Sequence, residues 1–148
     1  DFATEALEKR LYDSGYDRQL KTLFIWQGVT YYLTPEAVDS TLAFVANHSG
    51  QGSSIIFDYM ATSLLNGTIK RGEVSGMRRY RRFTGEGLTF GIDEGTIEEF
   101  LHQRGFRQIK NVTTGYLKKA YFTGVNRKRE VASGYAIVSA TVKSHADE

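Results

Sequence analysis

The stretch "FIWQGVTYYLTPEAV", residues 24–38, carries the pattern that decides the fold. A short apolar and aromatic run comes first, and Gln27 and Gly28 follow it directly. Thr34 is then suited to cap a helix, and Pro35 to occupy its first position. The stretch therefore predicts a buried strand, a loop at its carboxyl end and a helix, in that order. In an open α/β sheet, ligands bind at such strand ends.

Outward from this stretch, the pattern predicts a parallel unit. Residues 22–26 and 54–58 are short β-branched and aromatic runs, typical of strands that are buried on both faces. The helix between them serves as a crossover, which favours a parallel, right-handed arrangement. A further amphipathic helix over residues 3–14 precedes the first strand and ends at Gly15, a residue suited to a left-handed C-terminal cap.

The C-terminal half predicts one more helix and two more strands. Asp93 is suited to cap a helix with one apolar face, and Gly105 to end it. Residues 106–112 and 134–142 are predicted as the last strands. The stretch between them resembles a hairpin-type connection, so these strands are expected to pair antiparallel.

Composition limits the classes of function. The chain has 148 residues, 41% of them apolar and 24% charged, as expected for one globular domain or part of one. The net charge of +2 implies no obligatory polyanion partner, so no nucleic acid is expected. No apolar run approaches the ~20 residues of a membrane span, so no membrane partner is expected either. The lack of cysteine excludes disulfides and thiolate metal sites and is compatible with the cytoplasm. The three histidines have no metal-ligand spacing, and no metal is assigned.

Taken together, several segments resemble a known family. They are "DF" at the start, "SGYD", "FIWQGVTYYLTPEAVDSTLAFVA", "SIIFDY", "GEGLTFGI", "FLHQRGF" and "GYAIVSATV". In this order they are similar to S-adenosylmethionine-dependent methyltransferases, within the leucine carboxyl methyltransferase family that includes polyketide O-methyltransferases. The resemblance covers the C-terminal half of that family. It implies an α/β fold, namely the C-terminal half of a doubly wound, Rossmann-like class I methyltransferase sheet with antiparallel last strands.

The resemblance also implies a cofactor and its contacts. Residues 1–148 are expected to be the C-terminal part of a single methyltransferase domain, with the N-terminal cofactor-binding half missing and S-adenosylmethionine as the cofactor. In the family, the residues that match Asp1 and Phe2 contact the adenine. Gln27, followed by Gly28, stands where the family usually has a Glu that contacts the amino-acid end of the donor. An amide at this position lacks the negative charge that would face the donor's cation.

Each of these residues has a structural alternative. Asp1 can be only a helix N-cap, and Gly28 only a turn residue. Tyr31 and Tyr32 are candidates for the substrate pocket or for packing aromatics. Asp58 ends the second strand of the unit and can simply cap the next segment of the chain. No residue is identified as catalytic.

Three classes of function remain open. The first is a methyltransferase acting by O- or carboxyl methyl transfer on a small-molecule or protein acceptor, with a small molecule favoured. The second is a remnant without cofactor that acts as a binding or structural module. The third is a nucleic-acid binder that uses the basic run at residues 78–82, a run that is usually a solvated face. An apolar sheet edge exposed in such a half-sheet would favour self-association.

Overall fold

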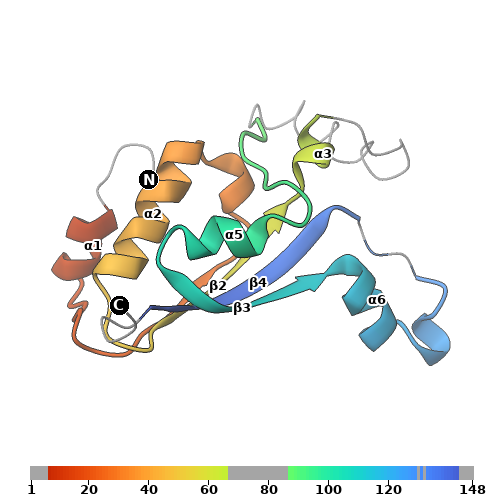
Figure 1. The fold of residues 1–148 in the computed structure, drawn as a ribbon. Helices are drawn as coiled ribbons and strands as arrows, with labels where there is room; N and C mark the ends of the chain where they lie inside the picture. Colours follow the sequence, from red (N-terminus) through yellow and green to blue (C-terminus); the bar gives the residue numbers. More distant parts are fainter. Residues whose placement is uncertain (1–6, 67–86, 130, 132, 144–148) are drawn as a thin grey trace.

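The computed structural model describes residues 7–66, 87–129, 131 and 133–143. Asp1, Phe2 and the basic run at residues 78–82 lie outside this part of the chain. The described elements, in chain order, are α1 (Leu7–Asp13), β1 (Leu23–Trp26), η1 (Thr30–Tyr32), α2 (Pro35–Asn47), β2 (Ser54–Met60), α3 (Thr62–Leu65), α5 (Ile97–His102), β3 (Phe106–Thr113), α6 (Thr114–Tyr121), η2 (Gly124–Asn126) and β4 (Tyr135–Val142), as Figure 1 shows.

The four strands form one mixed sheet in the order β1-β2-β4-β3. β1 and β2 run parallel, with Trp26 beside Phe57 at the end of the register, and α2 is the crossover between them. β4 lies between β2 and β3 and is antiparallel to both. The predicted parallel unit and the antiparallel last strands are therefore confirmed.

Start and stop signals explain where the helices lie. The Thr34 hydroxyl accepts a hydrogen bond from the amide of Ala37, and Pro35 opens α2 as predicted. α1 ends at Asp13, and Gly15, two residues later, has φ +84°, a value that favours glycine. The amides of Gly15 and Tyr16 bond back to the carbonyls of Tyr12 and Leu11, the pattern of a glycine-terminated helix.

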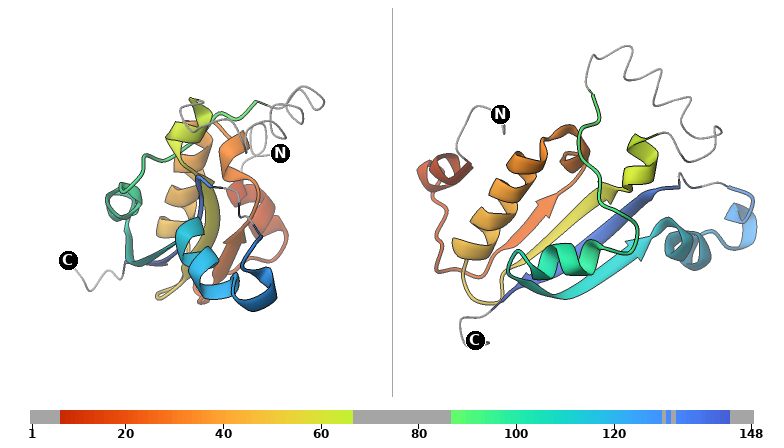
Figure 2. Two further views of the ribbon diagram at one scale, coloured as in Figure 1. Left: turned by 90° about the vertical axis from the view of Figure 1, so that its right-hand side faces the viewer. Right: turned by 45° about the horizontal axis from the view of Figure 1, so that its top comes forward.

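The helices α1, α2 and α5 lie on one side of the sheet (Figure 1). Seen from that side, α2 and α5 lie in front of the strands (Figure 2, right). The described part of the chain places no helix across the opposite face, and α6 lies beyond one end of the sheet. One face of the sheet is thus covered and the other is open.

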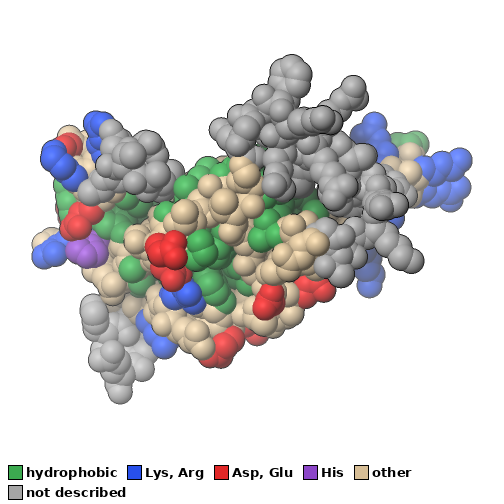
Figure 3. All heavy atoms as spheres, turned by 90° about the horizontal axis from the view of Figure 1, so that it is seen from above, with side chains coloured by type: hydrophobic (Ala, Val, Ile, Leu, Met, Phe, Trp, Pro, Cys, Tyr) green, Lys and Arg blue, Asp and Glu red, His purple; other side chains and the backbone are tan. Residues whose placement is uncertain are grey.

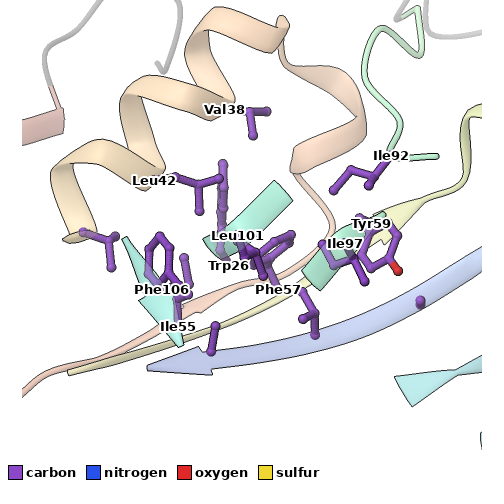
Figure 4. Packing of buried hydrophobic residues seen from close by; sticks show 14 of the residues in the cluster. Trp26, Val38, Leu42, Ile55, Phe57, Tyr59, Ile92, Ile97, Leu101 and Phe106 are labelled. Atoms are coloured by element: carbon purple, nitrogen blue, oxygen red, sulfur yellow. The ribbon is translucent and has the colours of Figure 1, made fainter. Parts of the chain in front are cut away.

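The hydrophobic core fills the space between the sheet and these helices. Alternate residues of the strands point into it, as the burial pattern of β4 shows. From α2, Val38 and Leu42 pack onto this face with no exposed surface, and Leu101 of α5 does the same (Figure 4). The core cluster also includes Trp26, Ile55, Phe57, Tyr59, Phe90, Ile92, Ile97, Phe106, Ala136, Val138, Ala140 and Val142.

Three predictions differ from the structure. β1 is buried on one face only: Leu23 is 56% exposed and Ile25 70%, because no described helix covers their side of the sheet. The connection between β3 and β4 is not a hairpin but contains α6 and η2; the Thr113 hydroxyl, which accepts from the Tyr116 amide at 3.4 Å, starts this helix. The N-cap position of α5 is Thr96, not Asp93.

The reason for the last difference is a turn ahead of α5. The amide and the hydroxyl of Thr96 both donate to the Asp93 carbonyl, at 3.1 and 2.9 Å. These bonds form a tight turn, and the helix begins only at Ile97.

In the described residues, no helix is long and apolar enough to cross a bilayer.

Candidate functional site

The carboxyl ends of the parallel strands β1 and β2 form the candidate site. Because Trp26 pairs with Phe57, Gln27, the first residue after β1, lies beside Asp58, which is still inside β2, two residues before that strand ends at Met60. The Gly28 amide donates to Asp58 Oδ1 at 2.6 Å, and the buried Thr30 hydroxyl donates to the Asp58 carbonyl at 2.7 Å. Gly28 itself has φ +72°. Asp58 therefore fixes the loop that follows β1.

Three tyrosines surround this loop. Tyr31 and Tyr32 lie in η1, directly after the strand, with ring centroids 4.8 Å apart. Tyr135 begins β4, and because β4 is antiparallel to β2, this start lies at the carboxyl end of β2. The rings of Tyr31 and Tyr135 meet edge to face at 6.0 Å. The Thr89 amide donates to the Tyr31 carbonyl at 2.9 Å and holds η1 in place.

The environment of Tyr135 favours its neutral form. Burial raises the pKa of the Tyr135 hydroxyl above its ordinary value, and the nearby Tyr32 hydroxyl and Asp58 carboxylate raise it further. A neutral phenol can donate one hydrogen bond and accept others. Tyr135 is thus a neutral phenol near the strand ends and not a base.

A groove of about 450 Å³ begins at these strand ends and continues along the open face of the sheet. Gln27, Asp58 and Tyr135 line its polar end. Its remaining walls are mainly apolar and come from β1, β2, β4 and the segment between β3 and β4; they are lined by Ile25, Ile56, Phe57, Thr114, Leu117, Val131, Ala136 and Ile137. Such a volume, with a few polar groups on apolar walls, is typical of small-molecule sites.

A larger hollow, of about 700 Å³, lies between α1 and α2. Tyr32 borders it, so it adjoins the strand-end loop. Glu8 of α1, Glu36 of α2 and His48, which directly follows α2, line it, and His48 Nδ1 lies 3.4 Å from Glu8 Oε1. These polar groups are not on strand ends, and the groove at Gln27 has the geometry expected of an α/β ligand site.

The structure brings four of the six predicted site residues together. Gln27, Gly28, Tyr31 and Tyr32 all lie at the end of β1. Their roles in binding stay predictions, as do those of the two residues at the start of the chain. Among the described residues, no group of three or more His, Cys, Asp or Glu side chains could hold a metal ion.

Two features of the site were missed. Tyr135 was not singled out, although an antiparallel last strand must begin where the parallel strands end. Asp58 was predicted to end the second strand, with capping of the next segment as the alternative, whereas β2 continues to Met60 and the Asp58 carboxylate accepts from the Gly28 amide. The contact joins residues 30 positions apart, so no local sequence signal carries it.

Comparison with known proteins places this geometry in context. The family model of leucine carboxyl methyltransferase matches residues 1–46. The chain is 27% identical over 133 residues to the "Putative S-adenosyl-L-methionine-dependent methyltransferase YktD" of Bacillus subtilis strain 168. This match includes 90% of the chain but only 43% of YktD, so the chain spans less than half the length of this relative. The resemblance predicted from the sequence is confirmed.

Solved structures share the fold at much lower identity. Human N-acetylserotonin methyltransferase, solved in complex with SAM, superposes on 82% of the chain with a TM-score of 0.50 and 12% identity; the match takes 29% of that protein. A phosphoethanolamine N-methyltransferase from Haemonchus contortus superposes on 87% with a TM-score of 0.53 and 11% identity, over 35% of its own length. The chain therefore has the Rossmann-like fold of these methyltransferases, over part of their length.

Proposed function

We propose that this chain is the C-terminal part of an S-adenosylmethionine-dependent methyltransferase domain and that the methyl donor binds at the carboxyl ends of β1 and β2. The observation that carries the proposal is the meeting of Gln27, Gly28 and Asp58 at adjacent parallel strand ends. Open α/β sheets bind their ligands at this edge. The similarity to YktD and to the leucine carboxyl methyltransferase model supports the choice of donor.

The groups present fit such a donor. S-Adenosylmethionine carries a sulfonium and an ammonium as well as apolar methylene groups, and the groove offers both kinds of surface. Gln27 and Asp58 supply oxygens at its polar end, and the Asp58 carboxylate adds a negative charge. Ile25 and Ile137 supply the apolar walls. By resemblance, Gln27 contacts the amino-acid end of the donor, and Asp1 and Phe2 contact the adenine.

The bound donor supplies an electrophilic methyl group on a good leaving group, so the protein has mainly to position the reactants and exclude water. Asp58 fixes the Gly28 loop, and that loop orients Gln27 at the end of β1. Tyr31 and Tyr32, which follow on η1, are the proposed border of the acceptor pocket. A carboxylate acceptor would need no base, whereas a hydroxyl acceptor would have to give up its proton.

A small molecule is the proposed acceptor, with transfer to an oxygen or carboxyl group. The cytoplasm is the proposed location, because a chain without cysteine suits a reducing compartment. The second candidate, a binding or structural module without cofactor, is favoured by one observation. Gln27 stands where the family usually has a Glu, which removes a charge that would attract the donor.

Calorimetric titration with S-adenosylmethionine, carried out on a longer chain that includes the upstream half of the domain, separates the two candidates. We expect Gln27→Glu to tighten donor binding about fivefold to tenfold, because a carboxylate near a cation contributes ~1 kcal/mol in a solvent-exposed site. Gln19→Glu adds the same charge in the exposed loop after α1 and should leave the affinity unchanged. Equal affinities of wild type and Gln27→Glu would remove Gln27 from the site. No heat of binding for any variant would favour the module without cofactor.

A further inference from the structure

Positive charge is concentrated in the segment between β3 and β4. Residues 93–99 contain four acidic side chains and no Lys or Arg, whereas residues 100–129 contain eight Lys and Arg and no Asp or Glu. We call residues 114–129, which end just before Glu130, the basic arm. Its cations are Lys118, Lys119, Arg127, Lys128 and Arg129.

The five cations of the basic arm are available to a partner. All of them are exposed, and none of the ion pairs between described residues involves them. Lys and Arg side chains gather at the right-hand end of the molecule in Figure 3, the end where Figure 1 places α6. The arm therefore presents a positive surface that the described chain does not neutralise.

The basic arm adds little to the hydrophobic core. Neither α6 nor η2 has a buried residue. The arm is attached at its base, where the Thr114 hydroxyl donates to the Tyr135 carbonyl at 3.0 Å, and α6 extends beyond the end of the sheet (Figure 1). Side chains that stay in water contribute little to folding, so folding stability does not account for the apolar residues of the arm.

Three large apolar side chains of the arm are in contact with water. Tyr116 is 60% exposed, Tyr121 69% and Val125 97%. Tyrosine has an apolar ring and a polar hydroxyl, a combination that suits the boundary between an apolar and an aqueous phase. The arm thus combines cations with exposed apolar groups in one short segment.

A tight turn presents Val125 to the outside. Val125 is the middle residue of η2, and Gly124 before it has φ +56°, a value that favours glycine. The Asn126 amide closes the turn by donating to the carbonyl three residues earlier, at 3.0 Å. Residues 127–129, which follow directly, are all cationic. The turn therefore places an aliphatic side chain at its apex beside three positive charges.

We propose that the basic arm docks on the anionic surface of a lipid bilayer. Lys and Arg are attracted to anionic headgroups, while exposed tyrosine and aliphatic side chains enter the boundary between headgroups and acyl chains. Such a contact is peripheral and needs no helix that crosses the bilayer. It agrees with the proposed location in the cytoplasm, because the cytoplasmic leaflet carries anionic lipids.

Other anionic partners fit the arm less well. A nucleic acid would pair with the cations and could stack on the tyrosines, but it would offer Val125 no apolar surroundings. A second copy would bring its acidic residues 93–99; Ile97, the large apolar residue among them, is buried, so it could not cover Tyr121 and Val125. Both occupants are outcomes of the experiment that tests the proposal.

The experiment measures sedimentation of the protein with lipid vesicles, using a chain that includes the upstream half of the domain. One set of vesicles contains phosphatidylcholine alone, and the other also contains phosphatidylglycerol. We expect binding to the anionic vesicles to be roughly tenfold tighter or more, with a difference that shrinks as salt is added. Equal binding to the two sets, or binding to neither, would overturn the proposal.

Charge variants test whether the arm is the part that binds. Lys128→Glu with Arg129→Glu should weaken binding to the anionic vesicles roughly tenfold or more. Arg18→Glu with Lys21→Glu changes the net charge equally at exposed positions outside the arm and should leave most of the binding intact. Equal losses in the two double variants would mean that only the net charge matters and would overturn the proposal.

A neutral substitution tests the apolar part of the contact. Val125→Ser leaves the charge unchanged and, at a side chain that is 97% exposed, should leave the fold intact. We expect it to weaken vesicle binding about threefold to tenfold, because serine does not favour the acyl region. Leu20→Ser, at a leucine that is 62% exposed outside the arm, should have no effect. An unchanged affinity of Val125→Ser would contradict the insertion of the turn.

The other occupants give different results. Tighter binding to a DNA duplex than to anionic vesicles would assign the arm to a nucleic acid and overturn the proposal. A dimer that Lys128→Glu with Arg129→Glu dissociates, without vesicle binding, would assign the arm to a second copy and also overturn it. None of these measurements uses S-adenosylmethionine. A protein that binds the vesicles but not the donor would therefore reject the proposed function alone.

Discussion

The two faces of the same four strands differ in what covers them. On the covered face, Phe57 and Val138 have at most 1% of their surface exposed, and Phe57 lies in the packed core (Figure 4). On the open face, one residue away along the same strands, Ile137 is 41% exposed. Apolar side chains are therefore present on both faces, but only one face of the described chain contributes a closed core.

The comparison shows that the apolar composition of a strand does not by itself tell how much the strand contributes to the free energy of unfolding. An apolar residue stabilises the folded chain only to the extent that folding removes it from water, at about 25 cal/mol per Å². Residues of the open face keep much of their surface exposed, so they contribute little to folding. They remain available to contribute to binding. Substitutions that act on one face and not on the other test this division directly.

The largest expected effect is that of Phe57→Ala on the covered face. Phe57 is 1% exposed and packs against Trp26 at a ring distance of 5.9 Å. Removing the ring should lower the free energy of unfolding by about 3–5 kcal/mol, because it loses the buried surface and leaves a cavity. Urea unfolding followed by circular dichroism measures this loss.

The neighbouring position provides the control. Ile56 belongs to the same strand but lines the groove on the open face, so Ile56→Ala should lower the free energy of unfolding by only about 1 kcal/mol. If Phe57→Ala does not fold, Phe57→Leu and Ile56→Val give the same order on a smaller scale. Equal losses at the two positions would contradict the division between the faces.

A smaller effect is expected at the strand-end site, where Asp58 joins β2 to the loop after β1. Asp58→Ala removes the acceptor of the Gly28 amide and should lower the free energy of unfolding by about 1.5–3 kcal/mol, the range for hydrogen bonds to charged groups. It should also speed amide exchange at Gly28, measured by NMR. Asp58→Asn keeps an oxygen acceptor and should retain most of the protection.

The result at Gly28 also decides between two roles of Asp58. If both substitutions leave exchange at Gly28 unchanged, the loop is held by Thr30 and η1 without the carboxylate. Asp58 would then be a surface carboxylate at the mouth of the groove. Its contribution to the candidate site would be only its charge.

Much of the fold could be predicted from the sequence because its signals are local. The N-cap and proline of α2 lie within two residues, and the short apolar runs of β1 and β2 mark strands on their own. α6 was missed because "TGYLKKAY" is only eight residues long, has a glycine in its first turn and buries none of its side chains, so it lacks the long core-facing stripe that marks α2. The burial of β1 on one face only could not be predicted from the sequence either, because it depends on where helices distant in the chain lie.

Some residues of the candidate site could likewise be predicted from local sequence, and others could not. Gln27, Gly28, Tyr31 and Tyr32 follow one strand, so a single stretch of sequence brings them together. Asp58 and Tyr135 reach the site through strand pairing. The sequence could indicate that these strands exist, but not which side chains the register places beside Gln27.

The smallest expected effect is that of a substitution on the open face, where almost no loss of folding stability is expected. It gives the sharpest test of the difference between the two faces. Ile25→Thr on the open face should change the free energy of unfolding by less than about 0.5 kcal/mol: the side chain is already 70% exposed, and threonine retains the β-branched shape that strands favour. Ile55→Thr, at a residue 1% exposed on the covered face, should cost several times more, since it also buries a hydroxyl. Urea unfolding of both variants gives the ratio. A loss at Ile25 as large as that at Ile55 would mean that the two faces contribute equally to the free energy of unfolding, and would contradict the division between them.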